Sequence, residues 1–88
     1  MSRAANPELV AIGNRFKEER VRVKLTQDQL ASRMKIGLRS VNGYEAGRAL
    51  INSRTLLKMR SIGLDAAYVL LGVRVLPERA LEEASNQS

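Results

Sequence analysis

The sequence predicts an all-α fold, a compact domain of five helices with a short C-terminal extension. Three observations favour this prediction. Residues that cap helix N-termini precede runs of apolar residues at helical spacing, glycines stand where those runs end, and strand-like alternation occurs only briefly near the C-terminus. We expect the helices within residues 1–72 and the extension, a strand-like segment plus a short helix, within residues 73–88.

Composition restricts the functions that the chain can have. The sequence contains no Cys and no His, which excludes a Cys/His zinc site and any mechanism that needs an imidazole base. We therefore expect no enzyme, no cofactor and no metal site. The longest apolar run, residues 66–71, is too short to span a membrane, and we see no secretory signal, so we expect a cytoplasmic protein that does not bind membranes.

Charge is distributed unevenly along the chain. The formal net charge is +6. Residues 1–64 carry 13 Lys and Arg against 5 Asp and Glu, whereas residues 65–88 carry 2 against 4. A basic body of this kind favours a polyanion as partner. Aromatic residues make up only 3% of the chain, which disfavours single-strand binding through stacked bases.

The first predicted helix begins after Asn6, a good N-cap, with Pro7 at its first position. Its apolar stripe contains Leu9, Ile12 and Phe16, and the next position on that stripe is Arg20. A charge on a buried stripe is costly unless it is paired. Most of the other charged residues of this segment are interpreted as a solvated face: Arg15, Lys17, Glu18, Glu19, Arg22 and Lys24.

The second and third predicted helices are short and close together. Thr26 and Gln29 have the spacing of a capping box at the start of the second helix. A break at residues 35–37 precedes a third helix over residues 38–46, in which Val41 and Tyr44 face inward and the opposite face is largely polar. Two short helices joined by a tight turn indicate a helix-turn-helix.

Two further helices complete the predicted domain. Ser53 is expected to cap a fourth helix that ends at Ile62, and Asp65 to cap a fifth over residues 66–71 that Gly72 ends. The fourth helix is expected to supply four core residues: Leu56, Leu57, Met59 and Ile62. Residues 73–76 alternate like a strand, and residues 77–84 form a last short helix. This extension is either a dimerisation element or a cover for the core.

From Ile12 to Gly72 the chain resembles, without gaps, the lambda-repressor/Cro-type helix-turn-helix family. The residues that carry the resemblance are residues 25–31 for the positioning helix, then Val41, Tyr44, Glu45 and Gly47 for the recognition helix, and residues 57–72. The chain departs from the family pattern at three places. Lys35 stands where glycine is usual in the turn, Gly43 where a longer side chain is usual, and the loop 48–52 lacks proline.

The resemblance implies a sequence-specific transcriptional regulator of double-stranded DNA, most simply a repressor that acts as a homodimer on an inverted repeat, either autoregulatory or of phage type. It implies four base-contacting residues: Leu38, Arg39, Asn42 and Gly43. It implies five residues at the phosphate backbone: Thr26, Gln27, Ser40, Arg48 and Arg54. It also implies an ion pair between Arg20 and Glu45. No small-molecule effector is expected.

Alternatives stay open at this point. The role of N-cap fully explains Thr26, whereas Gln27 has no capping duty and is expected to contact phosphate. Gly43 either lets DNA approach the backbone or stands at an exposed position without a role. Arg20 and Glu45 either pair or each reach solvent. The whole domain is either a DNA-binding regulator or a protein-interaction module, such as an antitoxin or a coactivator adaptor.

Overall fold

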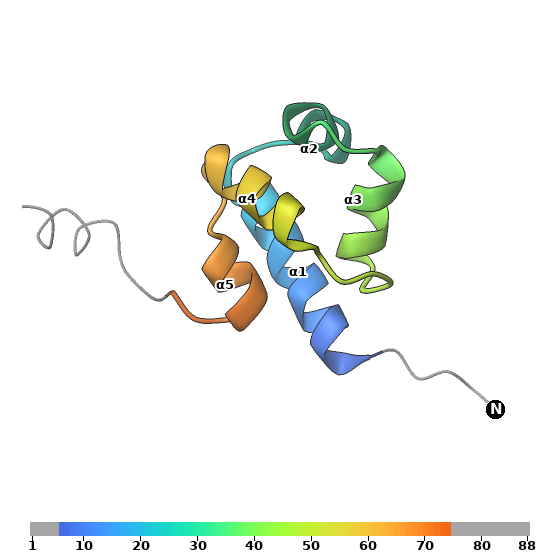
Figure 1. Ribbon diagram of the computed structural model, residues 1–88, viewed down its shortest axis with the longest axis vertical. Helices are drawn as coiled ribbons and strands as arrows, with labels where there is room; N and C mark the ends of the chain where they lie inside the picture. Colours follow the sequence, from blue (N-terminus) through green and yellow to red (C-terminus); the bar gives the residue numbers. More distant parts are fainter. Residues whose placement is uncertain (1–5, 75–88) are drawn as a thin grey trace, which may run out of the picture.

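The computed structural model describes residues 6–74 and contains five helices there (Figure 1). These are α1 (Pro7–Arg22), α2 (Gln27–Met34), α3 (Leu38–Glu45), α4 (Ser53–Ser61) and α5 (Ala66–Leu71). The predicted all-α, five-helix fold is confirmed, with no strand in the described part of the chain. Most of the predicted strand-like segment 73–76 and all of the helix 77–84 lie outside the described residues. None of the helices in residues 6–74 has the length and hydrophobicity of a membrane-spanning segment.

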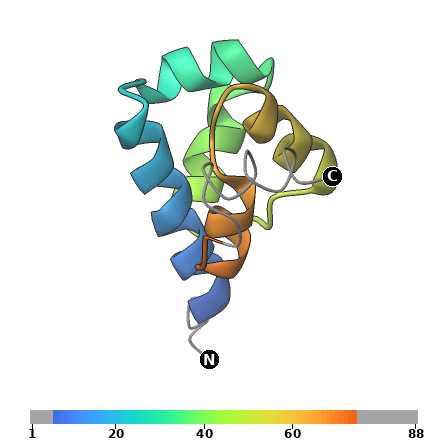
Figure 2. The same cartoon turned by 90° about the vertical axis from the view of Figure 1, so that its left-hand side faces the viewer.

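Helix α1 is the element around which the others are arranged. It packs against α3 and against α5, which lie on opposite sides of it in Figure 1. Helix α2 crosses one end of the bundle and packs against α3 and α4, and α4 packs against α5 (Figure 2). The turn between α2 and α3 is therefore at one end of the molecule.

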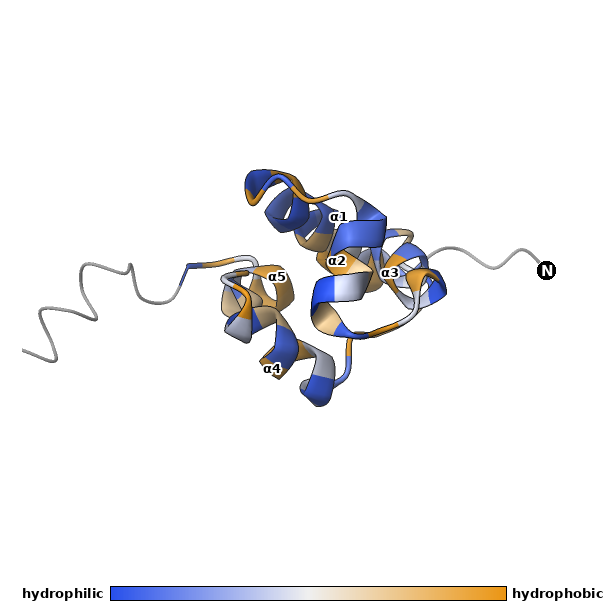
Figure 3. Ribbon diagram, turned by 90° about the horizontal axis from the view of Figure 1, so that it is seen from above, coloured by the Kyte–Doolittle hydropathy of each residue, from blue (hydrophilic) through white to orange (hydrophobic). Residues whose placement is uncertain are grey.

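The core contains residues from all five helices. Phe16, Leu30, Val41, Met59 and Val69 are fully buried, one from each helix. The rings of Phe16 and Tyr44 meet edge to face, with centroids 5.9 Å apart and planes at 83°. Figure 3 shows that the hydrophobic residues lie on the sides of the helices that face one another.

The predicted caps of α1 and α2 are confirmed. Asn6 Oδ1 accepts the backbone N–H of Glu8 at 2.9 Å. Thr26 Oγ1 accepts the N–H of Gln29 at 3.1 Å, and the Gln29 side chain accepts the N–H of Thr26 at 2.9 Å. Both caps depend on residues within three positions of each other, which is why the sequence shows them directly.

The prediction for α4 was wrong in its N-cap and in one core residue. The cap is Asn52, whose Oδ1 accepts the N–H of Thr55 at 2.8 Å, so Ser53 is the first residue of the helix. Thr55 and Met59 lie one turn apart on the buried face. Leu57, two residues after Thr55, points to the other side and is 66% exposed.

Candidate nucleic-acid interface

The turn between α2 and α3 has a lysine at the position that usually requires glycine. Lys35 has φ 55° and ψ 46°, the left-handed conformation, and its N–H donates to Ser32 O at 3.2 Å. Ile36 N–H donates to Ala31 O at 3.0 Å, which ends α2 before Gly37 caps α3. Lysine at this position keeps the turn geometry at a cost of about 1–2 kcal/mol relative to a right-handed residue.

Helix α3 presents a polar face to solvent. Val41 and Tyr44 are buried against the core. Leu38, Arg39 and Ser40 are exposed in the first turn, and Asn42 is half-buried. Of the four residues predicted to read bases, Leu38 and Arg39 therefore lie on the outside at the start of the helix, Asn42 is half-buried and Gly43 is buried. The start is the part of a recognition helix that reaches base edges in the major groove.

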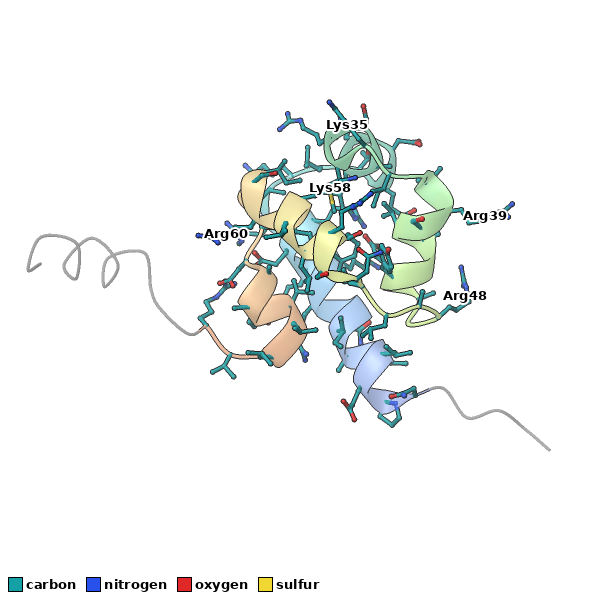
Figure 4. The ribbon with its side chains drawn as sticks, in the orientation of Figure 1. Lys35, Arg39, Arg48, Lys58 and Arg60 are labelled. Atoms are coloured by element: carbon teal, nitrogen blue, oxygen red, sulfur yellow. The ribbon has the colours of Figure 1, made fainter. Side chains whose placement is uncertain are left out.

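Arg39 and Arg48 lie on the same side of the molecule, the side of α3 that faces away from α1 (Figure 4). Arg39 comes from α3, and Arg48 from the loop that follows it, where its N–H donates to Gly43 O at 2.9 Å. Arg54, in the first turn of α4, is also exposed. Within residues 6–74 none of these three guanidinium groups forms a salt bridge, so all three are available to an anion.

Arg20 and Glu45 form a bidentate ion pair between α1 and the end of α3. Arg20 Nε lies 2.6 Å from Glu45 Oε2, and Nη2 lies 3.2 Å from Oε1. Arg20 Nη1 also donates to Leu25 O at 2.8 Å. The side chains are only 12% and 6% exposed, so the pair is largely shielded from water.

Gln27 has a structural partner that the sequence did not show. Its Nε2 donates to Glu45 Oε1 at 3.0 Å, and the residue is half-buried. Gln27 has no capping role, since its neighbour Thr26 is the N-cap as predicted, but it makes this structural contact with Glu45. Through Glu45, the first residue of α2 is tied to the last residue of α3, which fixes the two helices relative to each other.

Gly13 is a further residue that the sequence reasoning missed. A Cβ at this position would lie 2.3 Å from Tyr44 O and 2.9 Å from Glu45 O, so the backbones of α1 and α3 touch here. At Gly47, which has φ 73°, an added Cβ would lie 2.8 Å from Val10 Cα. A glycine inside an otherwise regular helix was the available signal, because glycine destabilises a helix unless packing requires it.

Most of the charged residues expected on a solvated face are exposed, but Glu19 is an exception. Glu19 is fully buried and accepts hydrogen bonds from Arg22 at 2.8 and 3.0 Å, from Arg74 at 3.0 Å and from the backbone N–H of Asp65 at 2.9 Å. Burial alone would raise the pKa of Glu19, but these bonds outweigh it and lower the pKa from 4.5 to about 2. Arg15 likewise donates to the carbonyls of α5, at 2.9 Å to Val69 O.

The cluster of Glu19, Arg22, Asp65 and Arg74 joins α1 to the residues on either side of α5. The Arg20–Glu45 pair instead joins α1 to α3. The carboxylate of Glu19 contacts only α1 and residues 65–74, so the cluster holds parts of the fold together. We therefore assign it to the attachment of α5 and place the candidate interface on α2, α3 and the loop after α3.

Residues 16–62 match the profile of the helix-turn-helix family. The chain belongs to this family. The match covers the capping box of α2, the turn at Lys35 and all of α3, which are the parts of the motif described above. The resemblance to the Cro/C1 type that the sequence suggested is thereby confirmed.

Two known proteins are similar to this helix-turn-helix chain. One is the crystal structure of the restriction-modification controller protein C.AhdI from Aeromonas hydrophila, with a TM-score of 0.67 and 25% identity over 73% of this chain and 98% of that one. The other is multiprotein-bridging factor 1 from Candida albicans, 38% identical over 56 residues. That match covers 62% of this chain and 37% of the yeast protein, so the chain spans little more than a third of that relative. The family and the controller protein indicate a DNA-binding transcriptional regulator rather than an enzyme.

Proposed function

We propose that this protein is a sequence-specific repressor that binds double-stranded DNA as a homodimer. One observation carries the proposal. The first turn of α3 presents Arg39 with no carboxylate partner in the described chain, on a helix whose last residue is fixed by the Arg20–Glu45 pair. A helix held in this way can enter the major groove as a rigid element.

The side chains of α3 have distinct chemistry for base readout. Arg39 can donate two hydrogen bonds to O6 and N7 of a guanine, a contact worth about 1–3 kcal/mol of discrimination. Asn42 can pair with an adenine through its amide, and Leu38 can pack on a thymine methyl. Together with Gly43, these residues form the proposed base-reading surface.

Five residues around α3 form the proposed phosphate-contacting set: Thr26, Gln27, Ser40, Arg48 and Arg54. The contact between Gln27 and Glu45 uses one N–H of the amide and leaves the other free to donate to a phosphate oxygen. Glu45 thereby orients Gln27 as well as Arg20. Thr26 is at the N-terminus of α2, and the N-terminus of a helix favours the binding of an anion such as a phosphate. Arg48, in the loop after α3, and Arg54, in the first turn of α4, supply positive charge.

A dimer follows from the small size of the reading surface. One helix reads only a few base pairs, so two copies on an inverted repeat, with half-sites about 34–36 Å apart, give a unique operator. We assign residues 73–88, which follow the domain of residues 1–72, as the dimerisation element. In this proposal the protein works in the cytoplasm and represses by occupying an operator, in its own operon or in a phage genome, without a small-molecule effector.

The proposal is tested by selecting duplexes from a random-sequence library with the purified protein and measuring Kd by fluorescence anisotropy at two salt concentrations. We expect an enriched inverted repeat, bound in excess nonspecific DNA, and a Kd that rises steeply with salt. Arg39→Ala should weaken binding about 10- to 100-fold. Arg60→Ala is the matched control, because Arg60 points to the opposite side of the molecule from Arg39 (Figure 4). Equal effects of the two variants would overturn the proposed surface.

The similarity to the bridging factor supports a second candidate function, an adaptor that connects proteins. In that case no duplex would be enriched, and DNA binding would be weak and insensitive to Arg39→Ala. The same selection experiment therefore separates the two candidates.

A further inference from the structure

Helix α4 has an exposed face that combines a leucine with basic residues. Leu57 is 66% exposed, more than any other large hydrophobic residue within residues 6–74. Arg54 precedes it by about one turn and Lys58 follows it directly, so the two basic residues share one edge of this face. Within residues 6–74 neither Arg54 nor Lys58 forms a salt bridge. The described part of the chain thus provides no partner for this face.

The chemistry of this face indicates what can cover it. Helix α4 contains no acidic residue, so two copies of the face placed against each other would oppose like charges. A suitable partner is therefore acidic and carries an apolar side chain for Leu57. Lys58 comes from α4, whereas Arg39 and Arg48 lie on the side of α3 (Figure 4). A partner at Lys58 leaves the proposed base-reading residues free.

The chain itself contains a segment with the matching pattern. Residues 77–84, which lie outside the described residues, have the sequence PERALEEA, with three acidic residues and one basic residue. Glu78, Leu81 and Glu82 follow one another at the same spacing as Arg54, Leu57 and Lys58. Each of the two segments therefore has a leucine beside two like charges, and the charges of the two segments are opposite.

We propose that residues 77–84 of one copy dock on the exposed face of α4 of a second copy, which returns the same contact. This inference rests on the proposed function and deepens it by naming the surface that the dimerisation element binds. Each copy supplies one acidic segment and one basic face. Two identical contacts then close a twofold-symmetric dimer.

The charges also set the direction of the segment on α4. In a helix over residues 77–84, Glu78 and Glu82 lie on the edge that corresponds to the basic edge of α4. Corresponding edges of two helices meet face to face only when the helices run in opposite directions. An antiparallel segment brings Glu78 to Lys58. It brings Glu82 to Arg54, whose five N–H donors can hold a carboxylate and a phosphate together.

The anchor at Arg74 favours a second copy over the segment's own domain. Arg74 pairs with Asp65 at 2.6 Å and with Glu19 at 3.0 Å, and its guanidinium lies 4.3 Å from the centre of the Tyr68 ring. The chain is thus held three residues before Pro77, and three Cα–Cα steps span at most about 11 Å. So short a connection restricts how the segment can turn along its own α4, whereas a second copy can approach in the required orientation.

The test measures the dimer Kd of the full chain by sedimentation equilibrium. The samples are wild type, Lys58→Glu, Glu78→Lys, the chain with both changes, and an equimolar mixture of the two single variants. Leu57→Ser tests the apolar part of the contact. Lys17→Glu, on the exposed face of α1, is the control for the same charge reversal elsewhere. A cooperative thermal transition verifies that each variant is folded.

We expect each single reversal to weaken the dimer about tenfold or more, because its homodimer contains two pairs of like charges. The chain with both changes and the equimolar mixture should each return to a Kd close to that of wild type. In the mixed dimer both contacts again join opposite charges, which happens only if the segment crosses to the other copy. Leu57→Ser should also weaken the dimer, and Lys17→Glu should not.

Three results would overturn the inference. Single reversals that stay within twofold of the wild-type Kd would show that the dimer contact lies elsewhere. Rescue in the chain with both changes but not in the mixture would show that the segment docks on its own α4. Rescue in neither would show that Lys58 and Glu78 do not meet. A wild-type protein that stays monomeric would contradict the dimer of the proposed function itself, which the duplex selection tests independently.

Discussion

The guanidinium of Arg20 and the carboxylate of Glu45 join the first helix to the last residue of the recognition helix, with Nε 2.6 Å from Oε2. Both side chains are more than four-fifths buried. Each of these charged residues interrupts an apolar pattern in the sequence, and in the folded protein each neutralises the charge of the other. Because Glu45 also accepts a bond from Gln27, this carboxylate connects α1, α2 and α3.

Loss of the Glu45 carboxylate should strongly destabilise the protein. In Glu45→Ala the buried Arg20 keeps its charge without a partner, and we expect the free energy of unfolding to fall by about 3–5 kcal/mol, measured by urea denaturation. Glu45→Gln, which retains oxygen and nitrogen atoms near Arg20 and Gln27, should cost less than Glu45→Ala. A loss below about 1 kcal/mol for Glu45→Ala would instead indicate that solvent compensates both charges.

Acid should weaken the domain through Glu19. Its pKa is lowered from 4.5 to about 2 in the folded protein, so the folded state favours the ionised carboxylate. The resulting stability is fully present above about pH 4.5 and is lost as the pH falls towards 2. The effect is on the order of 2–3 kcal/mol after screening, because the side chains of Arg22 and Arg74 are 49% and 46% exposed.

Unfolding free energies measured by denaturant between pH 7 and pH 2 test this dependence on Glu19. Glu19→Gln should be less stable than wild type at pH 7. Its unfolding free energy should fall much less between pH 4.5 and pH 2 than that of wild type. A wild-type and a variant curve that run parallel over that range would contradict the assignment.

An alanine at Gly13 should destabilise the domain, since its Cβ would lie 2.3 Å from Tyr44 O. The obstacle is backbone, which cannot rotate away, so α3 must shift outward. We expect the free energy of unfolding to fall by about 1–3 kcal/mol and DNA binding to weaken. Gly43→Ala should not reduce stability. The opposite behaviour of the two glycines in the same thermal unfolding experiment is the result to check.

Replacement of Lys35 by glycine should stabilise the turn between α2 and α3. The residue has φ 55°, which glycine adopts without the clash that a Cβ causes. Part of the gain is offset by the greater chain entropy of glycine when unfolded, so we expect a net gain of about 0.5–1 kcal/mol. Thermal unfolding measures it, with Lys17→Gly in the middle of α1 as a control that should lose stability.

The sequence predicted the features that depend on neighbouring residues. Asn6 and Thr26 were identified as caps because their partners lie within three positions. Arg20 was found because it interrupts an apolar stripe. The register of α4 could not be predicted in the same way, since Asn52 and Ser53 are both good caps and only packing against the core decides between them.

The contacts that the sequence did not predict join distant segments. Glu19 was assigned to a solvated face because its partners Asp65 and Arg74 lie 46 and 55 residues further along the chain. The bond between Gln27 and Glu45 spans 18 residues and depends on the angle between α2 and α3. The sequence did not show why residue 13 must be glycine, because the carbonyls that exclude a side chain there belong to α3.

The division of α3 into two faces has a consequence for how new binding specificities could be obtained from this scaffold. Val41, Tyr44 and Glu45 secure the helix to the bundle, whereas Leu38 and Arg39, which are proposed to read bases, are exposed. The residues that hold the helix and those proposed to read bases are therefore different residues. The exposed side chains of α3 can be replaced by others that favour different bases, and the core of the bundle does not need to be repacked.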